Sequence, residues 1–107
     1  MPKLTIQIKK YGDFLGTRKI GGEIREYINE EWDKFNIIVF DMGGVKGLTN
    51  SFADECFGKL LLEKGLDEFN KKLRFKNLNP LVRTVLHFVL GRRYRERKSN
   101  LSKKEEE

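Results

Sequence analysis

The feature that most constrains the fold is the apolar run "NIIVFDM" at residues 36–42. A continuous apolar run of this length, followed at once by paired glycines, predicts a central β-strand that is covered on both faces. The run ends near Asp41, just before Gly43 and Gly44. A carboxylate at the carboxyl end of a parallel strand can reach a ligand in the loops above it, so Asp41 is a candidate for chemistry.

Haloacid-dehalogenase-type phosphatases open in a similar way, with a nucleophilic aspartate at the end of their first strand. Their chemistry also needs Mg²⁺ ligands and a cation beside the transferred phosphoryl group. Here Gly43 stands where the usual second aspartate would be, and only Asp54 and Asp67 follow downstream. We therefore expect Asp41 to cap the loop or contact a neighbour, and we expect no enzyme activity.

The rest of the chain alternates between strand-like and helix-like patterns. Apolar and polar residues alternate near the N-terminus, whereas later segments repeat their apolar residues at helical spacing. This β-α-β-α-β-α order predicts a single-domain α/β sandwich with a mixed or largely parallel central sheet. The expected strands are 3–10, 36–42 and 71–78, and the expected helices are 18–32, 51–65 and one that begins at Pro80.

Polar residues before each helical pattern identify its expected start. Thr17 precedes the first helix, and Asn79 followed by Pro80 precedes the last. For the second helix we expect Asn50 or Ser51 to be the cap, with Ser51 and Asp54 spaced as in a capping box.

Glycines give two further expectations. Gly65 is placed to end the second helix. Gly21 and Gly22 lie inside the first helix, where each glycine costs about 1 kcal/mol relative to alanine. We expect this pair to mark close packing against the sheet.

The chain is rich in charge: 36% of residues are charged, the formal net charge is +6 and the pI is about 9.5. Much of the excess lies in "GRRYRERK" at 91–98. Such a block at a terminus is typical of a solvated end, and it is also compatible with nucleic-acid binding. The candidate nucleic-acid contacts are Arg92, Arg93, Arg95, Arg97 and Lys98.

Cys56 and His87 are single residues of their kind, so no zinc motif, disulfide or catalytic triad is predicted. Cys56 falls on the inward face of the second helix, and we expect it in the core. No apolar run reaches the roughly 20 residues needed to cross a bilayer. We expect a cytoplasmic protein without cofactor, metal or membrane contact.

A polar turn, "KGLTNS" at 46–51, precedes the second helix. Backbone N–H groups at a helix start favour an anion or a phosphorylated side chain, so Ser51 and Thr49 are candidate phosphoacceptors. The alternative is that these polar residues only cap the start of the second helix. The expected outward-facing, partner-binding residues are Lys46, Thr49, Asn50, Ser51, Asp54 and Glu55.

The strand "IIVFDMGGV", the loop "KGLTNS" and the helix "FADECFGKLL" together resemble STAS domains, known from anti-sigma factor antagonists. More narrowly, "SFADECFGKL" resembles small prokaryotic STAS-like domains that carry a "SFADE" sequence. The resemblance covers about Leu4 to Leu90. We expect a STAS-like domain over 1–98 and a disordered charged tail over 99–107.

The resemblance implies a non-enzymatic regulatory module that binds a signalling partner, such as a kinase-like ATPase, through the 46–55 loop and helix start. Matched to the antagonists, Asn50 occupies the phosphoacceptor position. The phosphorylation switch of the antagonists therefore does not transfer directly to this chain.

Overall fold

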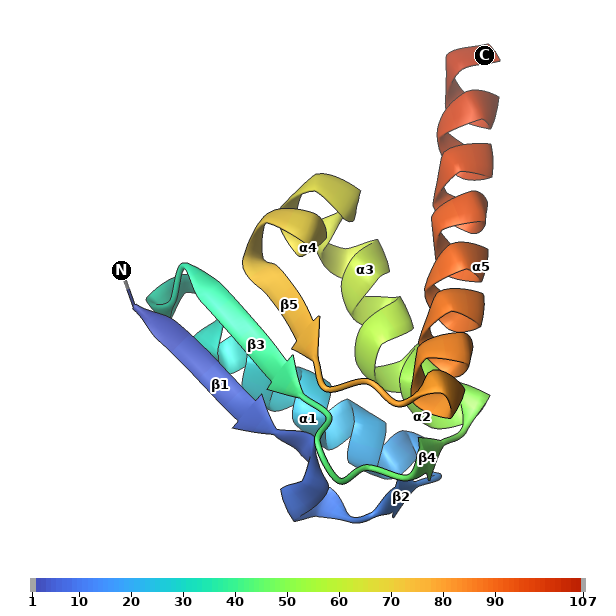
Figure 1. Cartoon of the computed structure of the whole chain (residues 1–107). Helices are drawn as coiled ribbons and strands as arrows, with labels where there is room; N and C mark the ends of the chain where they lie inside the picture. Colours follow the sequence, from blue (N-terminus) through green and yellow to red (C-terminus); the bar gives the residue numbers. More distant parts are fainter. Residues whose placement is uncertain (1, 107) are drawn as a thin grey trace.

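The computed structural model describes the backbone of residues 2–106 and the side chains of residues 2–96. Its main sheet has three parallel strands in the order β1-β3-β5, with β3 (Ile37–Asp41) between β1 (Lys3–Gln7) and β5 (Leu73–Lys76). Ile6 lies opposite Phe40, and Phe40 lies opposite Phe75. The prediction of an α/β fold with a largely parallel sheet is confirmed (Figure 1).

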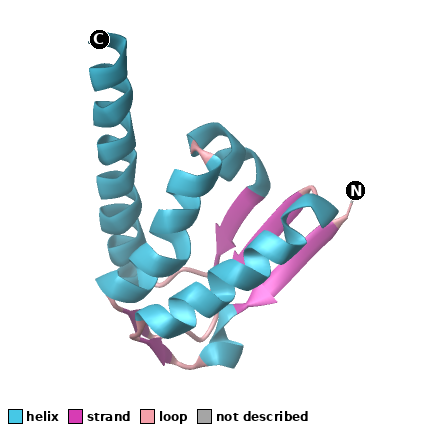
Figure 2. Cartoon of the chain, turned by 180° about the vertical axis from the view of Figure 1, so that it is seen from behind, coloured by secondary structure: helices cyan, strands magenta, loops and turns pink. Residues whose placement is uncertain are grey.

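Helices connect these strands and lie against one face of the sheet (Figures 1 and 2). The segment from α2 through α3 lies between α1 and α5 and packs against both. The helices are α1 (Arg18–Glu31), α2 (Asn50–Ala53), the π-helical turn η3 (Asp54–Gly58), α3 (Lys59–Lys64), α4 (Leu66–Lys72) and α5 (Pro80–Glu106), with the 3₁₀ turns η1 (Ile8–Tyr11) and η2 (Trp32–Lys34).

Two further strands of two residues each form a small parallel sheet beyond the carboxyl ends of the main strands. They are β2 (Phe14–Leu15) and β4 (Gly47–Leu48), with Phe14 opposite Gly47. Neither was expected, because two residues are too few to show a period of two. This small sheet joins the segment after β1 to the segment after β3 (Figure 1).

The predicted helix boundaries are mostly confirmed. Thr17 is the N-cap of α1 and accepts a hydrogen bond from the Ile20 N–H. Asn79 Oδ1 accepts a hydrogen bond from the Val82 N–H at the start of α5. Gly65 ends α3 with a positive φ of 85°, a backbone conformation that favours glycine.

The central strand is buried as expected, but helices cover only one of its two faces (Figure 1). Val39 lies between Thr5 and Arg74, both exposed, on the face opposite the helices. Val39 itself is nevertheless buried between its neighbours. The apolar run therefore reflects a central position in the sheet rather than a second layer of helices.

The expectation that Gly21 and Gly22 pack against the sheet is wrong. A Cβ atom at Gly21 would lie 2.9 Å from the carbonyl oxygen of Phe52 and 3.1 Å from the Cβ of Glu55. At Gly22 the nearest atom would be 3.8 Å away, an ordinary contact. Gly21 alone therefore permits close packing, and its neighbour is the α2–η3 segment.

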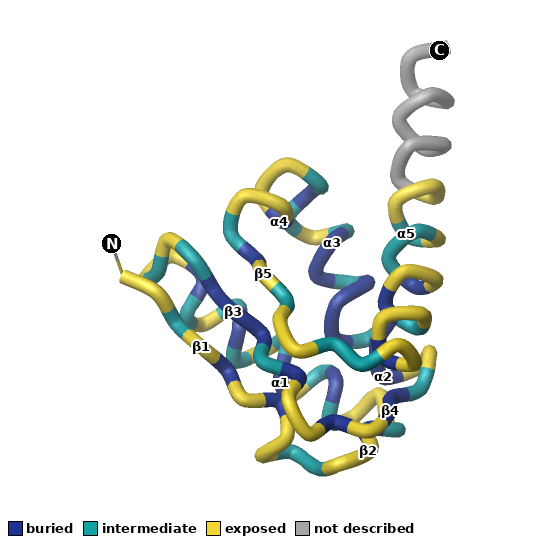
Figure 3. Tube along the Cα trace, in the orientation of Figure 1, coloured by how far each residue is buried: buried dark blue, intermediate teal, exposed yellow. Residues whose placement is uncertain are grey.

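The core lies between the sheet and the helices (Figure 3). Four phenylalanines meet there: the ring of Phe40 is 5.0 Å from that of Phe57 and 5.3 Å from that of Phe75, and Phe52 also contacts Phe57. Cys56 is buried in this core as predicted. Within residues 2–106 no helix combines the length and apolar character needed to cross a bilayer.

The expected boundary at residues 98 and 99 stays a prediction. α5 runs from Pro80 to Glu106, but the side chains of residues 97–107 lie outside the described part. The disordered tail proposed for residues 99–107 falls in that part of the chain.

Candidate functional site

Asp41, at the end of β3, is bonded to its own surroundings. Its Oδ1 accepts hydrogen bonds from the Gly43 N–H and from Asn77 Nδ2, each at 2.9 Å, and Lys76 Nζ lies 3.8 Å from Oδ2. The Asn77 bond, helped by that of Gly43, lowers the pKa of Asp41. The prediction that Asp41 caps the loop after its strand is confirmed.

The backbone of the turn after Asp41 is held by hydrogen bonds with two other segments. The Lys46 N–H donates to the carbonyl of Asp13, and Asn79 Nδ2 donates to the carbonyls of Val45 and Lys46. The backbone at 45 and 46 is therefore fixed between the β2 segment and the start of α5. The Lys46 side chain itself is exposed.

Thr49 caps the helix that follows, in place of the expected Asn50 or Ser51. Its Oγ1 accepts a hydrogen bond from the Phe52 N–H at 3.0 Å and donates one to the carbonyl of Gly16 at 3.0 Å. The hydroxyl of this candidate phosphoacceptor is thus engaged twice within the fold. Asn50 and Ser51 are exposed, so the 46–51 turn presents Lys46, Asn50 and Ser51 to solvent.

Asp54 is not an outward-facing residue, and the capping-box role expected for it is wrong. Its relative exposure is only 3%. Arg93 Nε donates to Oδ1 at 2.6 Å and Arg93 Nη2 donates to Oδ2 at 2.8 Å, a two-bond contact with α5. Arg18, at the start of α1, donates to Oδ2 at 3.2 Å. Hydrogen bonding from Arg93, more than that from Arg18, lowers the pKa of Asp54.

Glu55 is held in the same way, with 12% of its side chain exposed. Lys59, one turn later, lies 2.9 Å from Oε1, and Arg25 of α1 donates to Oε2 at 2.8 Å. Arg18 makes a longer contact at 3.3 Å. Lys59, followed by Arg25, lowers the pKa of Glu55. We call this group the Asp54–Glu55 cluster: Asp54, Glu55, Arg18, Arg25, Lys59 and Arg93.

The π-helical turn and a glycine accommodate the Asp54 carboxylate. Residues 54–58 form the wider π turn, a feature that often occurs at functional positions. A Cβ atom at Gly58 would lie 2.7 Å from Asp54 Oδ1 and 3.2 Å from the Cγ of Arg93. Gly58 therefore leaves the space in which the carboxylate meets the guanidinium.

Sequence reasoning missed Arg18, Arg25 and Arg93 as partners of the "SFADE" acids. The one available signal was Gly58, four residues after Asp54, because a glycine inside a helix suggests close packing. Arg93 lies 39 residues away from Asp54 and belonged to a basic block that looked solvated. No local pattern could pair the two residues.

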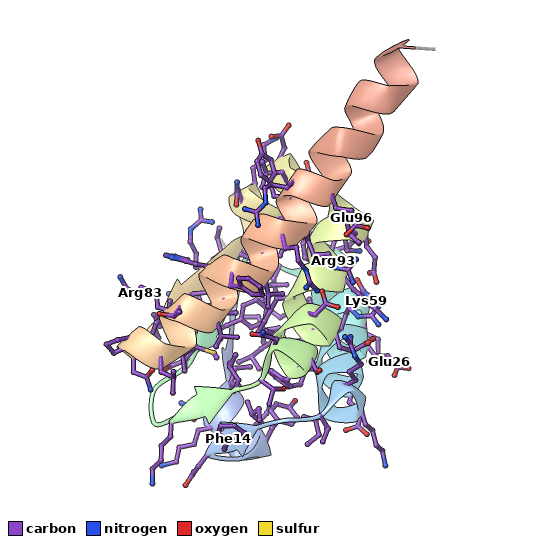
Figure 4. All side chains as sticks on the ribbon, turned by 90° about the vertical axis from the view of Figure 1, so that its right-hand side faces the viewer. Phe14, Glu26, Lys59, Arg83, Arg93 and Glu96 are labelled. Carbon is purple, nitrogen blue, oxygen red and sulfur yellow. The ribbon has the colours of Figure 1, made fainter. Side chains whose placement is uncertain are left out.

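The basic block is therefore only partly available to a ligand. Arg93 forms ion pairs with Asp54 and Glu96, and Figure 4 shows it directed toward the α2–α3 segment. The guanidinium carbon of Arg92 lies 5.9 Å from the centre of the Phe88 ring. Arg95 is exposed. Arg97 and Lys98 lie outside the described side chains, so their proposed nucleic-acid contacts stay predictions.

The remaining candidates for chemistry are not brought together. Burial raises the pKa of the Cys56 thiol, which disfavours a reactive thiolate. His87 is exposed on α5. Among the described residues no group of three or more histidine, cysteine, aspartate or glutamate side chains could hold a metal ion.

Comparison with known proteins gives one family. The profile of the STAS-like domain of unknown function, DUF4325, matches residues 13–83, from β2 to the first turn of α5. The match spans 71 of the 107 residues and includes the 46–51 turn, Asp54 and Glu55. Searches of curated proteins and of solved structures gave no significant match. With its parallel sheet and the "SFADE" helix start, the chain belongs to the STAS-like DUF4325 domain family.

Proposed function

We propose that this chain is a non-enzymatic, cytoplasmic regulatory module that binds a signalling protein through the 46–51 turn. The observation that carries the proposal is a division among the polar residues of this region. Asp41, Asp54 and Glu55 are bonded within the fold, whereas Lys46, Asn50 and Ser51 are exposed on a turn with a fixed backbone. A surface that is ordered before binding loses less entropy when a partner docks.

The hydrogen bonding of the acids within the fold also argues against an enzymatic role. A nucleophilic or proton-transferring carboxylate must reach its substrate, and Asp41 already accepts two hydrogen bonds at its Oδ1. We expect hydrolysis of p-nitrophenyl phosphate in Mg²⁺ to proceed at the same background rate with wild type and Asp41→Asn. A rate that depends on Asp41 would contradict the proposal.

The interaction is tested by affinity capture from native lysate with quantitative mass spectrometry. Asn50→Lys places a long cation on the turn, and Asn70→Lys makes the same change on exposed α4, at the other end of the molecule (Figure 1). We expect specific partners to be lost with Asn50→Lys and retained with Asn70→Lys. Retention of every specific partner by the Asn50→Lys variant would show that the turn is not the interface.

A further inference from the structure

Two large apolar side chains lie exposed and adjacent beside the 46–51 turn. Phe14 of β2 is 62% exposed and Leu81 of α5 is 59% exposed. A Cβ atom at Gly47 would lie 3.0 Å from Phe14 Cε2 and 3.5 Å from Leu81 Cδ2, so both side chains meet over this glycine. We call this pair the Phe14–Leu81 patch; Figure 4 shows Phe14 at the end of the molecule, beside β4.

The Phe14 ring is held against backbone although most of it faces solvent. Gly47 lies under one edge of the ring, and a Cβ atom at Gly16 would lie 3.6 Å from Phe14 Cε1 and 3.7 Å from the methyl of Thr49. Because the two glycines have no side chains, the ring can pack directly against the backbone of these two segments. A positioned aromatic ring of this kind is typical of an interface anchor, since little side-chain freedom remains to be lost.

The exposed charge near the patch is mostly positive. The two segments that form this end, 9–19 and 43–51, carry five exposed basic side chains and one exposed acid, Asp13. Arg18 is engaged by Asp54 and Glu55. Lys10 Nζ lies over the rings of Tyr11 and Tyr27. The remaining exposed cations of these two segments are Lys9, Lys19 and Lys46.

We propose that the Phe14–Leu81 patch is the anchor point for an acidic segment of a partner protein that inserts a large apolar side chain. The apolar side chain would cover Phe14 and Leu81, and the acids would face the exposed lysines of the two neighbouring segments. Opposite charges at the rim speed encounter and favour one class of partner. This inference deepens the proposed function and rests on it, because it assigns the chemistry of the partner that meets the 46–51 turn.

The same observations disfavour two other ligands for the patch, a single-stranded nucleic acid and a second copy of this chain. Single-stranded nucleic acid binds by stacking successive bases on aromatic rings, and this patch offers one ring and one aliphatic side chain. A second copy would bring the same lysines against themselves, in a chain whose net charge is +6. An acidic protein segment satisfies both the apolar pair and the charge.

The test is selection of a displayed random-peptide library on the full chain, followed by titration of an enriched synthetic peptide. The Phe14→Ser/Leu81→Ser variant removes the patch. Tyr94→Ser is the matched control, because Tyr94 is also an exposed aromatic side chain, 40% exposed, but lies far along α5. Each variant is first compared with wild type by circular dichroism and urea unfolding.

We expect enriched peptides to combine acids with a large apolar residue, and binding to fall about tenfold or more in the patch variant and to stay unchanged with Tyr94→Ser. No enrichment, or enrichment that survives the patch variant, would overturn the proposal. So would tighter binding of an oligothymidine probe through the same residues, or a dimer in sedimentation that the patch variant abolishes.

The Asn50→Lys variant separates the two proposals. If peptide binding is lost with Asn50→Lys but kept in the patch variant, the 46–51 turn is an interface and the proposed role of the Phe14–Leu81 patch is wrong. Peptide binding that neither change affects would contradict both.

Discussion

The 46–51 turn and the Asp54–Glu55 pair are polar stretches separated by two residues, and their surroundings are opposite. Asn50 and Ser51 face solvent, whereas Asp54 is buried against Arg93 and Arg18. The difference arises because Thr49 caps the helix start and the π turn that follows accommodates Asp54 between α1 and α5. Polar residues close together in sequence can thus have opposite surroundings: one set faces solvent, where we propose recognition, and the other holds helices together.

The largest loss in the free energy of unfolding should come from a substitution of the buried Asp54. Asp54→Asn leaves Arg93 without its charged partner, so we expect a loss of about 3 kcal/mol in the free energy of unfolding, near the low end for breaking a buried pair. Asn50→Ala, on the exposed side, should change it by less than about 0.5 kcal/mol. Urea unfolding measures both values, and equal effects would contradict the division.

Acid should erase this difference between wild type and Asp54→Asn. Hydrogen bonding from Arg93 lowers the pKa of Asp54 in the folded state, so its stabilisation is fully present above the unfolded pKa of about 3.9. That stabilisation is lost as the pH falls through the lowered folded pKa. Urea unfolding from pH 6 downward should show the gap between the two proteins closing; a constant gap would argue against the ion pair.

The next largest loss in stability should come from Gly21, where α1 packs closely against the α2–η3 segment. Gly21→Ala places a Cβ atom 2.9 Å from the Phe52 carbonyl oxygen, so we expect a loss of about 1–3 kcal/mol through overpacking. Gly22→Ala has room and should stabilise the helix by about 0.5–1 kcal/mol. Thermal unfolding of the two neighbouring variants provides the comparison, and changes of the same sign would refute the packing described for Gly21.

The smallest effect concerns the helix cap. Thr49→Ala removes the acceptor for the Phe52 N–H, so we expect a loss of about 1 kcal/mol. Ser51→Ala should be nearly neutral because the cap lies elsewhere. If urea unfolding instead finds Ser51→Ala to be the more harmful change, Ser51 is the cap after all.

Much of the fold could be predicted because its signals are local. The alternation near the N-terminus, the helical spacing after Thr17 and the Asn79–Pro80 start each lie within a few residues of what they specify. The extent of the second connection could not be predicted: α4 is short and buries only Phe69, so its sequence resembled a loop, and Lys71 and Lys72 were assigned to the third strand.

The candidate site was predicted less well than the fold. The exposure of Lys46, Asn50 and Ser51 was anticipated, but the role of Asp54 was not, because its main partner lies 39 residues further along the chain. Phe14 was overlooked because an isolated phenylalanine in a turn-rich segment belongs to no periodic pattern that would indicate its position. Only the pairing of β2 with β4 places it next to Gly47 and so beside the turn.

A double-mutant cycle between Asp54 and Arg93 tests the central claim most directly. The claim is that the acid of the "SFADE" motif joins helices and is not a recognition residue. With Asp54→Asn, Arg93→Gln and the double variant, urea unfolding should give a coupling free energy of at least about 1 kcal/mol, since contacting residues in one ion-pair network do not behave independently. A coupling energy near zero would contradict the claim and return Asp54 to the set of partner-binding residues.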